Sequence, residues 1–253
     1  MMRKILATLA SLAFGGIATS ASADPFPPVL NIVLVHGAFA DGSGWKGVSD
    51  ILRKDGFHVS IVQPPLTSIE DDVAATKRVL AQQDGPVILV GHSYGGAIIT
   101  EAGNDSRVEG LVYVAAFVPD EGDVLGAMLQ SMPGASHGVT PTKDGFLFLD
   151  PKVFAADFAG DLPKAEADSM AAAQMPVAAK AFGTPIVSPA WKTKPSFGIV
   201  ATDDRIINPD LERAMYKHAH ADVTEIKGSH SVFISQPQAV AAAIEEAAYS
   251  IGN

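Results

Sequence analysis

Cysteine is missing from this chain of 253 residues, and basic residues are scarce. Without cysteine the chain has no disulfide, no thiolate zinc site, no iron–sulfur cluster and no cysteine nucleophile. Its 18 Lys and Arg residues stand against 28 Asp and Glu residues, which gives a formal net charge of −10. Because phosphate groups are bound by clustered Lys and Arg, we expect neither nucleic acid nor an anionic membrane surface as a partner.

The residues that are present describe a globular protein. Hydrophobic residues make up 47% of the chain and charged residues 18%, a balance typical of a folded chain with a substantial core. We find no internal repeat and no linker that would divide the chain. The sequence leaves the oligomeric state open.

Residues 1–23 have the composition of a secretory signal peptide. Arg3 and Lys4 precede an apolar run over 5–17, and the small residues Ala21-Ser22-Ala23 follow. A basic start, a short apolar stretch and an A-x-A end are typical of a cleavable signal. We therefore predict cleavage after Ala23 and a secreted or periplasmic protein with no stable membrane insertion after cleavage. The alternative is an uncleaved membrane anchor.

Short runs rich in Val and Ile alternate with stretches of helical spacing along the rest of the chain. Ser68 and Asp71, for example, form a capping pair ahead of apolar residues that share one helical face. Continuous apolar strands separated by helices are typical of a parallel sheet covered on both faces. The predicted fold class is therefore α/β, with a mostly parallel, doubly wound sheet. The expected strands are 30–35, 58–62, 87–90, 111–114, 197–200 and 223–226, and the expected helices span about 44–55, 68–83, 94–103, 209–219 and 237–249.

Residues 119–189 interrupt this alternation. They contain several prolines, many Ala and Met residues and no strong strand pattern. A segment of about 70 residues is too long for an ordinary loop of a compact domain. We predict that 119–189 forms a mostly helical cap inserted into a core made of 24–118 and 190–253. The alternative is that these helices only complete the core.

The strongest local motif is Gly91-His92-Ser93-Tyr94-Gly95. It follows a predicted strand and precedes a predicted helix, which is the setting of a nucleophile elbow. In this turn the serine hydroxyl projects above the sheet at the positive end of a helix. The motif predicts that Ser93 is a catalytic nucleophile, and the alternative is a plain glycine-rich turn.

A serine nucleophile needs a base and an acid that orients the base. In hydrolases with this elbow the chain order is serine, acid, histidine, and His230 is the one histidine late enough and in a loop. The acid is expected at the end of the preceding strand, where Asp203 and Asp204 are adjacent. We favour Asp204, with Asp203 second and Asp120 as a minor alternative.

Two backbone N–H groups are expected to bind the oxyanion of the tetrahedral intermediate. Tyr94, the residue after the nucleophile, is predicted to supply one, and the loop after the first strand the other. In that loop Ala38 is the first choice and Phe39 the second. Apolar side chains near these motifs or in the cap are candidates for substrate binding: Trp45, Met128 and Met175.

These motifs together resemble the α/β-hydrolase superfamily. The resemblance rests on His36-Gly37-Ala38, on the elbow, on Ala201 to Arg205 and on Gly228-Ser229-His230, and it spans nearly all of the chain after residue 23. More narrowly, the chain is similar to the small capped branch with plant methyl-ester esterases and hydroxynitrile lyases. The resemblance implies an eight-stranded, mostly parallel sheet, a helical cap after the sixth strand and no cofactor. It does not identify the substrate, because the fold hosts many chemistries.

We therefore expect a serine esterase that cleaves small to medium carboxylic esters through an acyl-enzyme. One alternative is a carbon–carbon lyase of the hydroxynitrile-lyase type. The resemblance implies that such lyases carry threonine at the position of Gly37 and lysine at that of Ser231, so both residues favour the esterase. A second alternative is a non-catalytic ligand-binding protein.

Two further motifs suggest other classes of site. Gly42 to Gly47 reads G-x-G-x-x-G, the dinucleotide-binding pattern, but it begins seven residues after Val35 and contains Trp45. His218 and His220 could bind a metal, yet no further cluster of ligand residues accompanies them. We therefore predict no metal site and no cofactor.

Overall fold

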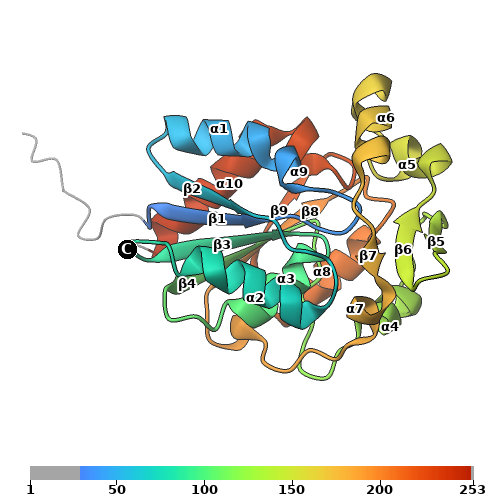
Figure 1. Cartoon of the computed structure of the whole chain (residues 1–253). Helices are drawn as coiled ribbons and strands as arrows, with labels where there is room; N and C mark the ends of the chain where they lie inside the picture. The colour runs from blue at the N-terminus through green and yellow to red at the C-terminus, as the bar shows by residue number, and fades with distance from the viewer. Residues whose placement is uncertain (1–28, 252–253) are drawn as a thin grey trace, which may run out of the picture.

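A computed structural model describes residues 29–251 of the protein, so the predicted signal peptide lies outside the described residues. Its centre is a six-stranded sheet with the order β2-β1-β3-β4-β8-β9, in which every neighbouring pair is parallel (Figure 1). This confirms the predicted α/β class and parallel sheet. The strands are β1 (Asn31–Val35), β2 (His58–Val62), β3 (Val87–His92), β4 (Val108–Val114), β8 (Ser196–Ala201) and β9 (Asp222–Ile226).

Helices cover both faces of this sheet (Figure 1). Alternate residues of each strand point to opposite faces, so Val33 of β1 belongs to one hydrophobic cluster and Leu34 to the other. The first cluster includes residues of α2, α3 and α8, and the second includes residues of α1, α9 and α10. These helices are α1 (Lys46–Lys54), α2 (Ile69–Leu80), α3 (Gly95–Ala102), α8 (Pro209–His218), α9 (Val232–Ser235) and α10 (Pro237–Ile251), with the short 3-10 helices η1 (Gly42–Trp45) and η2 (Ala190–Lys192).

Local sequence signals explain where the helices begin. The Ser68 hydroxyl accepts a hydrogen bond from the N–H of Asp71 at 3.1 Å, so the predicted capping pair starts α2. Asn208 caps α8 in the same way, through the N–H of Asp210 at 2.9 Å, and Pro209 occupies the first turn, where its missing N–H costs nothing. None of the described helices is long and apolar enough to cross a bilayer.

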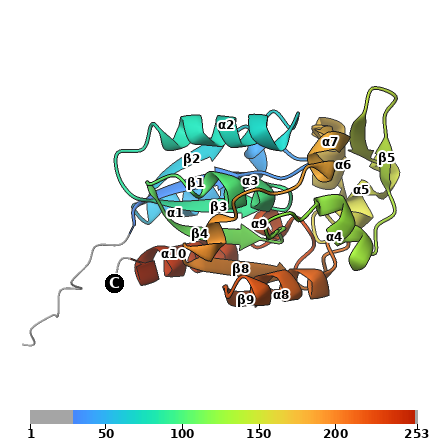
Figure 2. The same ribbon diagram turned by 90° about the horizontal axis from the view of Figure 1, so that it is seen from below.

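A separate group of elements lies between β4 and β8, at the end of the sheet (Figures 1 and 2). Its helices fall within the segment predicted as a cap, but it also contains a three-stranded antiparallel sheet of order β5-β6-β7 that we did not predict. Those strands have only three, four and two residues, too few to produce a sequence pattern. The elements are α4 (Leu125–Ser131), β5 (Val139–Pro141), β6 (Phe146–Leu149), α5 (Pro151–Asp157), α6 (Lys164–Ala173), β7 (Val177–Ala178) and α7 (Ala179–Gly183).

The strand count differs from what the resemblance implied. The main sheet of the described residues has six strands instead of eight, and its first strand along the chain is β1, which leads to His36. The cap elements accordingly follow the fourth strand, β4, and not the sixth. The boundaries 119–189 of the cap stay a prediction.

Candidate active site

Ser93 lies in a tight turn between β3 and α3. Its φ angle is 53°, in the left-handed region that residues other than glycine rarely adopt, at a cost of about 1–3 kcal/mol. The turn closes only because Gly91 has no side chain: a Cβ there would lie 2.5 Å from the carbonyl oxygen of Gly95. Hydrogen bonds to β4 and its following loop hold Ser93 in this geometry, from its N–H to Val114 O (3.2 Å) and from Phe117 N–H to its carbonyl (3.2 Å).

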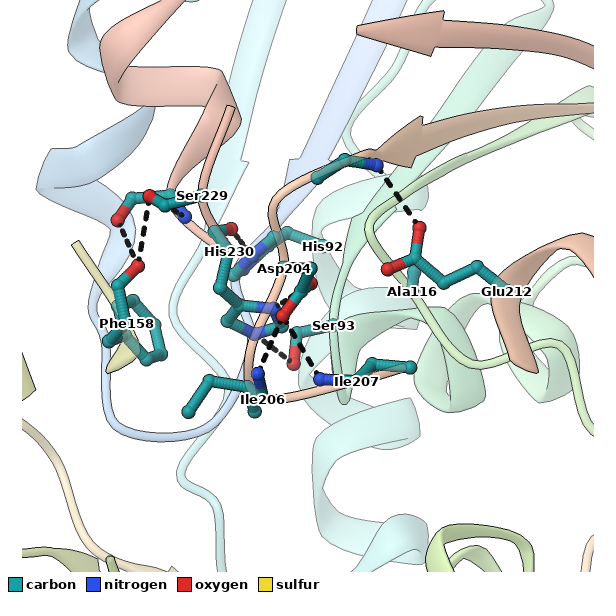
Figure 3. A network of polar contacts seen from close by, with 12 residues as sticks. His92, Ser93, Ala116, Phe158, Asp204, Ile206, Ile207, Glu212, Ser229 and His230 are labelled. Carbon is teal, nitrogen blue, oxygen red and sulfur yellow. Dashed lines mark hydrogen bonds and ion pairs between the residues drawn. The ribbon is translucent and has the colours of Figure 1, made fainter. Parts of the chain in front are cut away.

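Ser93, His230 and Asp204 form one chain of hydrogen bonds (Figure 3). The Nε2 atom of His230 lies 2.8 Å from Ser93 Oγ, and its Nδ1 atom lies 2.5 Å from Asp204 Oδ2. A carboxylate only accepts, so Nδ1 carries the proton and Nε2 is free to accept the hydroxyl proton of Ser93. The three residues come from the loops after β3, β8 and β9, at the carboxyl ends of parallel strands.

The adjacent carboxylates of Asp203 and Asp204 have different surroundings. Asp203 is exposed, whereas Asp204 is buried and its second oxygen accepts two backbone N–H bonds, from Ile206 at 2.7 Å and Ile207 at 3.0 Å. Arg205 bonds Asp157 at 2.9 Å rather than either neighbour. The minor alternative, Asp120, lies elsewhere and bonds His218 and Lys192.

His92, the histidine of the elbow, is hydrogen-bonded to the backbone of His230. His92 is fully buried, and its Nε2 donates to the carbonyl oxygen of His230 at 2.9 Å. Burial, and then the proximity of His230, lower the pKa of His92 well below its usual value. His92 is therefore neutral at pH 7, and it holds the backbone of His230 without adding a charge next to the imidazole.

The geometry separates the two candidates for the second oxyanion donor. The N–H of Phe39 already donates to the carbonyl of Met175 at 3.2 Å, whereas among the described residues the N–H groups of Ala38 and Tyr94 have no acceptor. The close approach of this loop to the elbow depends on Gly37, where a Cβ would lie 2.7 Å from Ser93 Cβ. Ala38 and Tyr94 are therefore the pair with free donors.

The side chain of Tyr94 is anchored by a buried carboxyl. Its hydroxyl donates to Asp72 Oδ2 at 2.6 Å, and Asp72 Oδ1 accepts from the N–H of Leu66 at 2.7 Å. Burial raises the pKa of Asp72 to about 6, although the hydrogen bonds from Tyr94 and Leu66 oppose this shift. Burial, followed by the nearby Asp72 carboxylate, raises the pKa of Tyr94, which keeps the phenol a donor.

A cavity of about 480 Å³ opens next to Ser93. This size suits a small organic molecule. Among the described residues that line it none carries a charge, and the polar side chains besides Ser93 are those of Gln130 and Ser136. Most of the lining is apolar, with side chains from the cap and from the loop after β8: Leu129, Val139, Leu147, Phe182 and Ile206.

The three residues predicted to bind substrate are not among those that line this cavity. Trp45 is fully buried on the other face of the sheet, where its ring contacts Phe233 at 4.5 Å between centroids. The ring also meets that of His92 in the elbow edge-on, with centroids 6.5 Å apart, so Trp45 packs beneath the elbow and not in the cavity. Met128 and Met175 are partly buried and pack against the core on the cap side. Phe39 and Ala38, predicted as oxyanion donors, do line the cavity.

Glu212 is a buried acid that the sequence analysis missed (Figure 3). It is fully buried on α8, and its Oε2 accepts from the N–H of Ala201 at 3.3 Å. Burial, and then the neighbouring Asp204 carboxylate, raise the pKa of Glu212 well above its usual value, which favours its protonated form. Its position on the same helical face as Tyr216, one turn later, is the signal that could have revealed it.

The alternative motifs carry no comparable site. Among residues 29–251 no group of three or more potential ligands could hold a metal ion. His218 instead bonds Asp120 at 2.9 Å, and His220 is exposed with a φ of 53°. The G-x-G-x-x-G stretch forms η1 and the start of α1, where Asp41 caps the turn by accepting from the N–H of Ser43 at 2.6 Å.

Known proteins resemble the chain over part or most of its length. A sequence profile described as the alpha/beta hydrolase family matches residues 32–243. A pyrethroid hydrolase of Sphingobium wenxiniae is 29% identical over 251 residues, covering 86% of this chain and 87% of that protein. A carbendazim hydrolyzing esterase of a Nocardioides species is 39% identical over 113 residues, or 39% of this chain and 47% of that protein. The crystal structure of a pyrethroid hydrolase from Sphingobium faniae, 25% identical, superposes with a TM-score of 0.73 over 87% of this chain and 97% of that one.

Proposed function

The chain belongs to the alpha/beta hydrolase family, and from this premise we propose that it is a serine esterase that cleaves small to medium carboxylic esters through an acyl-enzyme. One observation carries the proposal. Ser93 lines an apolar cavity and is hydrogen-bonded to His230, which is bonded in turn to Asp204, so the nucleophile faces a space that admits an organic molecule while its base and the orienting acid are buried beside it. The names of two relatives, a hydrolase and an esterase, support hydrolytic chemistry.

In the first half of the reaction Ser93 Oγ attacks the ester carbonyl carbon, and His230 Nε2 takes the hydroxyl proton. The electron pair of the carbonyl moves to its oxygen, and the N–H groups of Ala38 and Tyr94 stabilise the negative charge. When the tetrahedral intermediate collapses, the bond to the alcohol oxygen breaks and His230 returns the proton to the leaving alkoxide. The products of this half are the alcohol and an ester of Ser93.

In the second half a water molecule attacks the acyl carbon while His230 takes one of its protons. The intermediate then releases Ser93, which regains its proton from His230, and the free acid leaves. Asp204 keeps the proton of His230 on Nδ1 and stabilises the imidazolium that forms in both halves. The 2.5 Å contact and the two backbone N–H bonds to Asp204 support this role.

The cavity supports uncharged, apolar substrates. A charged group would lose its hydration there without a partner, because the lining has no side chain of opposite charge among the described residues. The leaving group and the acyl group both have to fit within about 480 Å³ or protrude from its mouth. We therefore propose neutral esters, with lactones or amides as weaker substrates.

Carbon–carbon lyase chemistry is less well supported. Ser231, at the position where the related lyases carry lysine, donates its hydroxyl to Phe158 O at 2.6 Å and supplies no cation for a cyanide leaving group. A side chain on residue 37 would collide with Ser93. A ligand-binding protein without turnover is opposed by the complete set of catalytic groups. Mandelonitrile cleavage faster than ester hydrolysis would reverse this preference for the esterase.

The test uses the purified protein and a panel of p-nitrophenyl esters with increasing acyl length. We expect hydrolysis of the acetate or butyrate, and a loss of several orders of magnitude in kcat for Ser93→Ala. An aryl phosphonate should add one covalent mass to the wild type and none to this variant. Labelling of another residue, or full activity of Ser93→Ala, would refute the proposed nucleophile.

We also propose that the chain is exported and cleaved after Ala23. The support is the basic, apolar and small-residue succession of residues 1–23. Intact-mass analysis of protein made in a Gram-negative host should show a chain that starts at Asp24, found outside the cytoplasm. A chain that retains Met1 would contradict cleavage.

A further inference from the structure

The loop that carries His230 is bonded to the cap at both residues flanking the histidine. On one side, Ser229 donates its N–H to Asp161 Oδ2 at 2.9 Å and its hydroxyl to Asp161 Oδ1 at 2.5 Å. On the other side, Ser231 donates its N–H at 3.0 Å and its hydroxyl at 2.6 Å to the carbonyl oxygen of Phe158 (Figure 3 shows Phe158 beside Ser229). We call residues 157–161 the clasp segment.

Asp161 accepts these bonds as a carboxylate. Burial raises the pKa of Asp161, but the hydrogen bonds from Ser229 and Ser235 outweigh burial, and the pKa lies below its usual value. The hydroxyl of Ser235, in α9, adds a bond of 2.6 Å. Among the described residues Asp161 has no Lys, Arg or His partner in an ion pair. Its charge is therefore balanced by hydrogen-bond donors of the segment 229–235 and not by a surface cation.

The clasp segment also contacts the imidazole of His230 and the loop that carries Asp204. The ring of Phe158 meets the ring of His230 edge-on, with centroids 4.8 Å apart. Asp157, at the end of α5, accepts from Arg205 Nε at 2.9 Å, and Arg205 directly follows Asp204. One short stretch of the cap thus contacts the loops that carry the base and the acid.

From these contacts we infer that Asp161 is a positioning residue for His230, and that the cap sets the geometry of the base together with the core. The inference rests on the proposed function, because it assigns Asp161 a part in that reaction. Without the carboxylate, Ser229 loses both of its bonds to Asp161 and keeps only the longer bond from its hydroxyl to Phe158 O at 3.2 Å. His92 and Ser231 continue to hold the backbone on the other side. A small displacement of the imidazole lengthens its bonds to Ser93 and Asp204, and rates are steeply sensitive to such displacements.

The experiment compares Asp161→Ala and Ser229→Ala with Asp168→Asn. Asp168 is the matched control, because it is a cap aspartate that is exposed and pairs only with Lys164. Ser229→Ala removes a hydroxyl that donates to Asp161 but leaves the charge of Asp161 in place. We expect Asp161→Ala to lower kcat for p-nitrophenyl butyrate by about ten- to a hundred-fold with KM changed less than about two-fold. Ser229→Ala should also lower kcat, by a smaller factor, and the kcat of Asp168→Asn should equal that of the wild type.

Two further measurements would change if Asp161 positions His230 and would stay unchanged if it only stabilises the cap. We expect the acid limb of the pH profile of kcat/KM to move to lower pH in both variants, because an imidazole displaced from Asp204 loses the carboxylate that stabilises its charge. The low-field proton resonance of the Nδ1–H of His230 should also weaken. Phosphonate titration of active sites corrects kcat for any misfolded fraction.

The outcomes distinguish a failure of the role proposed for Asp161 from a failure of the proposed esterase function. If both variants melt earlier while kcat per titrated site and the pH profile match the wild type, Asp161 is only a cap anchor and the inference is overturned. If Asp161→Ala does not fold, the same comparison with Ser229→Ala and Asp161→Asn decides. If the wild type itself is not phosphonylated at Ser93, the proposed function is wrong, and the part assigned to Asp161 in that reaction is overturned with it.

Discussion

The hydroxyl of Tyr94 donates to the carboxyl of Asp72 across a distance of 2.6 Å in the buried interior. Tyr94 follows Ser93, the proposed nucleophile, and Asp72 lies in the first turn of α2. The bond therefore connects a helix of the core to the backbone N–H that we propose as an oxyanion donor. This connection makes the position of that N–H depend on a residue far from the elbow in the sequence.

Tyr94→Phe should lower both activity and stability. Loss of the hydroxyl leaves a carboxyl oxygen of Asp72 buried without its donor, which costs about 1–3 kcal/mol in the free energy of unfolding. We expect kcat to fall a few-fold as the donor N–H becomes less well held. Tyr113→Phe is the control, since it removes a buried hydroxyl that contacts Thr100 at 3.0 Å, away from the cavity. Urea unfolding and ester kinetics measure both, and equal kcat values in the two variants would contradict the role of Tyr94.

Asp72 should make the free energy of unfolding depend on pH. Its pKa in the folded protein, about 6, lies above the value of an unfolded aspartate, so the protonated carboxyl favours the folded state at low pH. This contribution is lost as the pH rises from about 4 to about 6, because over this range the unfolded state gains stability by ionising Asp72 while the folded state keeps it protonated. Asp72→Asn cannot ionise. The stability of the variant relative to the wild type should therefore increase from about pH 4 to about pH 6 and then level off. A flat difference across this range would refute the raised pKa.

The paired aspartates should respond very differently to removal of charge. Asp204→Asn should reduce kcat by about four orders of magnitude, because an amide cannot hold the proton of His230 on Nδ1. Asp203→Asn should stay within about two-fold of the wild type, since that side chain is exposed. Steady-state kinetics with p-nitrophenyl butyrate compare the two. The opposite ranking would move the acid to Asp203.

The cavity should limit the length of the acyl or alcohol group. Leu129→Trp places a larger side chain in the lining, so we expect kcat/KM for a p-nitrophenyl octanoate to fall by about ten-fold or more, and that for the acetate by much less. Val187→Trp is the control, because Val187 is 72% exposed and does not line this cavity. An equal loss for both esters in the Leu129 variant would show that the substrate binds elsewhere.

The main sheet is predictable from the sequence because its strands are nearly continuous apolar runs between helices. The expected strand at 58–62 has the observed bounds of β2, and the expected helix at 237–249 matches α10 within two residues at its end. The cap strands are not predictable, because a strand such as β7 has two residues and its partner strand lies far away in the chain. Pairing of that kind leaves no periodicity within one segment.

Part of the candidate site is predictable from the sequence and part is not. The positions of Ser93 and His230 follow from local motifs and chain order, because strands that run parallel deliver their following loops to one edge. The surroundings of Trp45 and Glu212 depend on which face of a helix packs against the core. A rotation of the helix by one residue would place other side chains there. The contact between Asp161 and Ser229 joins residues 68 positions apart, which no local pattern reveals.

The clasp segment restricts how the cap could be exchanged between related enzymes. If the cap were an independent module, replacing it would change which esters are accepted and leave the catalytic groups untouched. Here a graft that removes residues 157–161 also removes the partners of Ser229 and Arg205. A chimaera that is meant to acquire a new substrate range should keep these five residues, or supply an equivalent carboxylate, if it is to retain turnover.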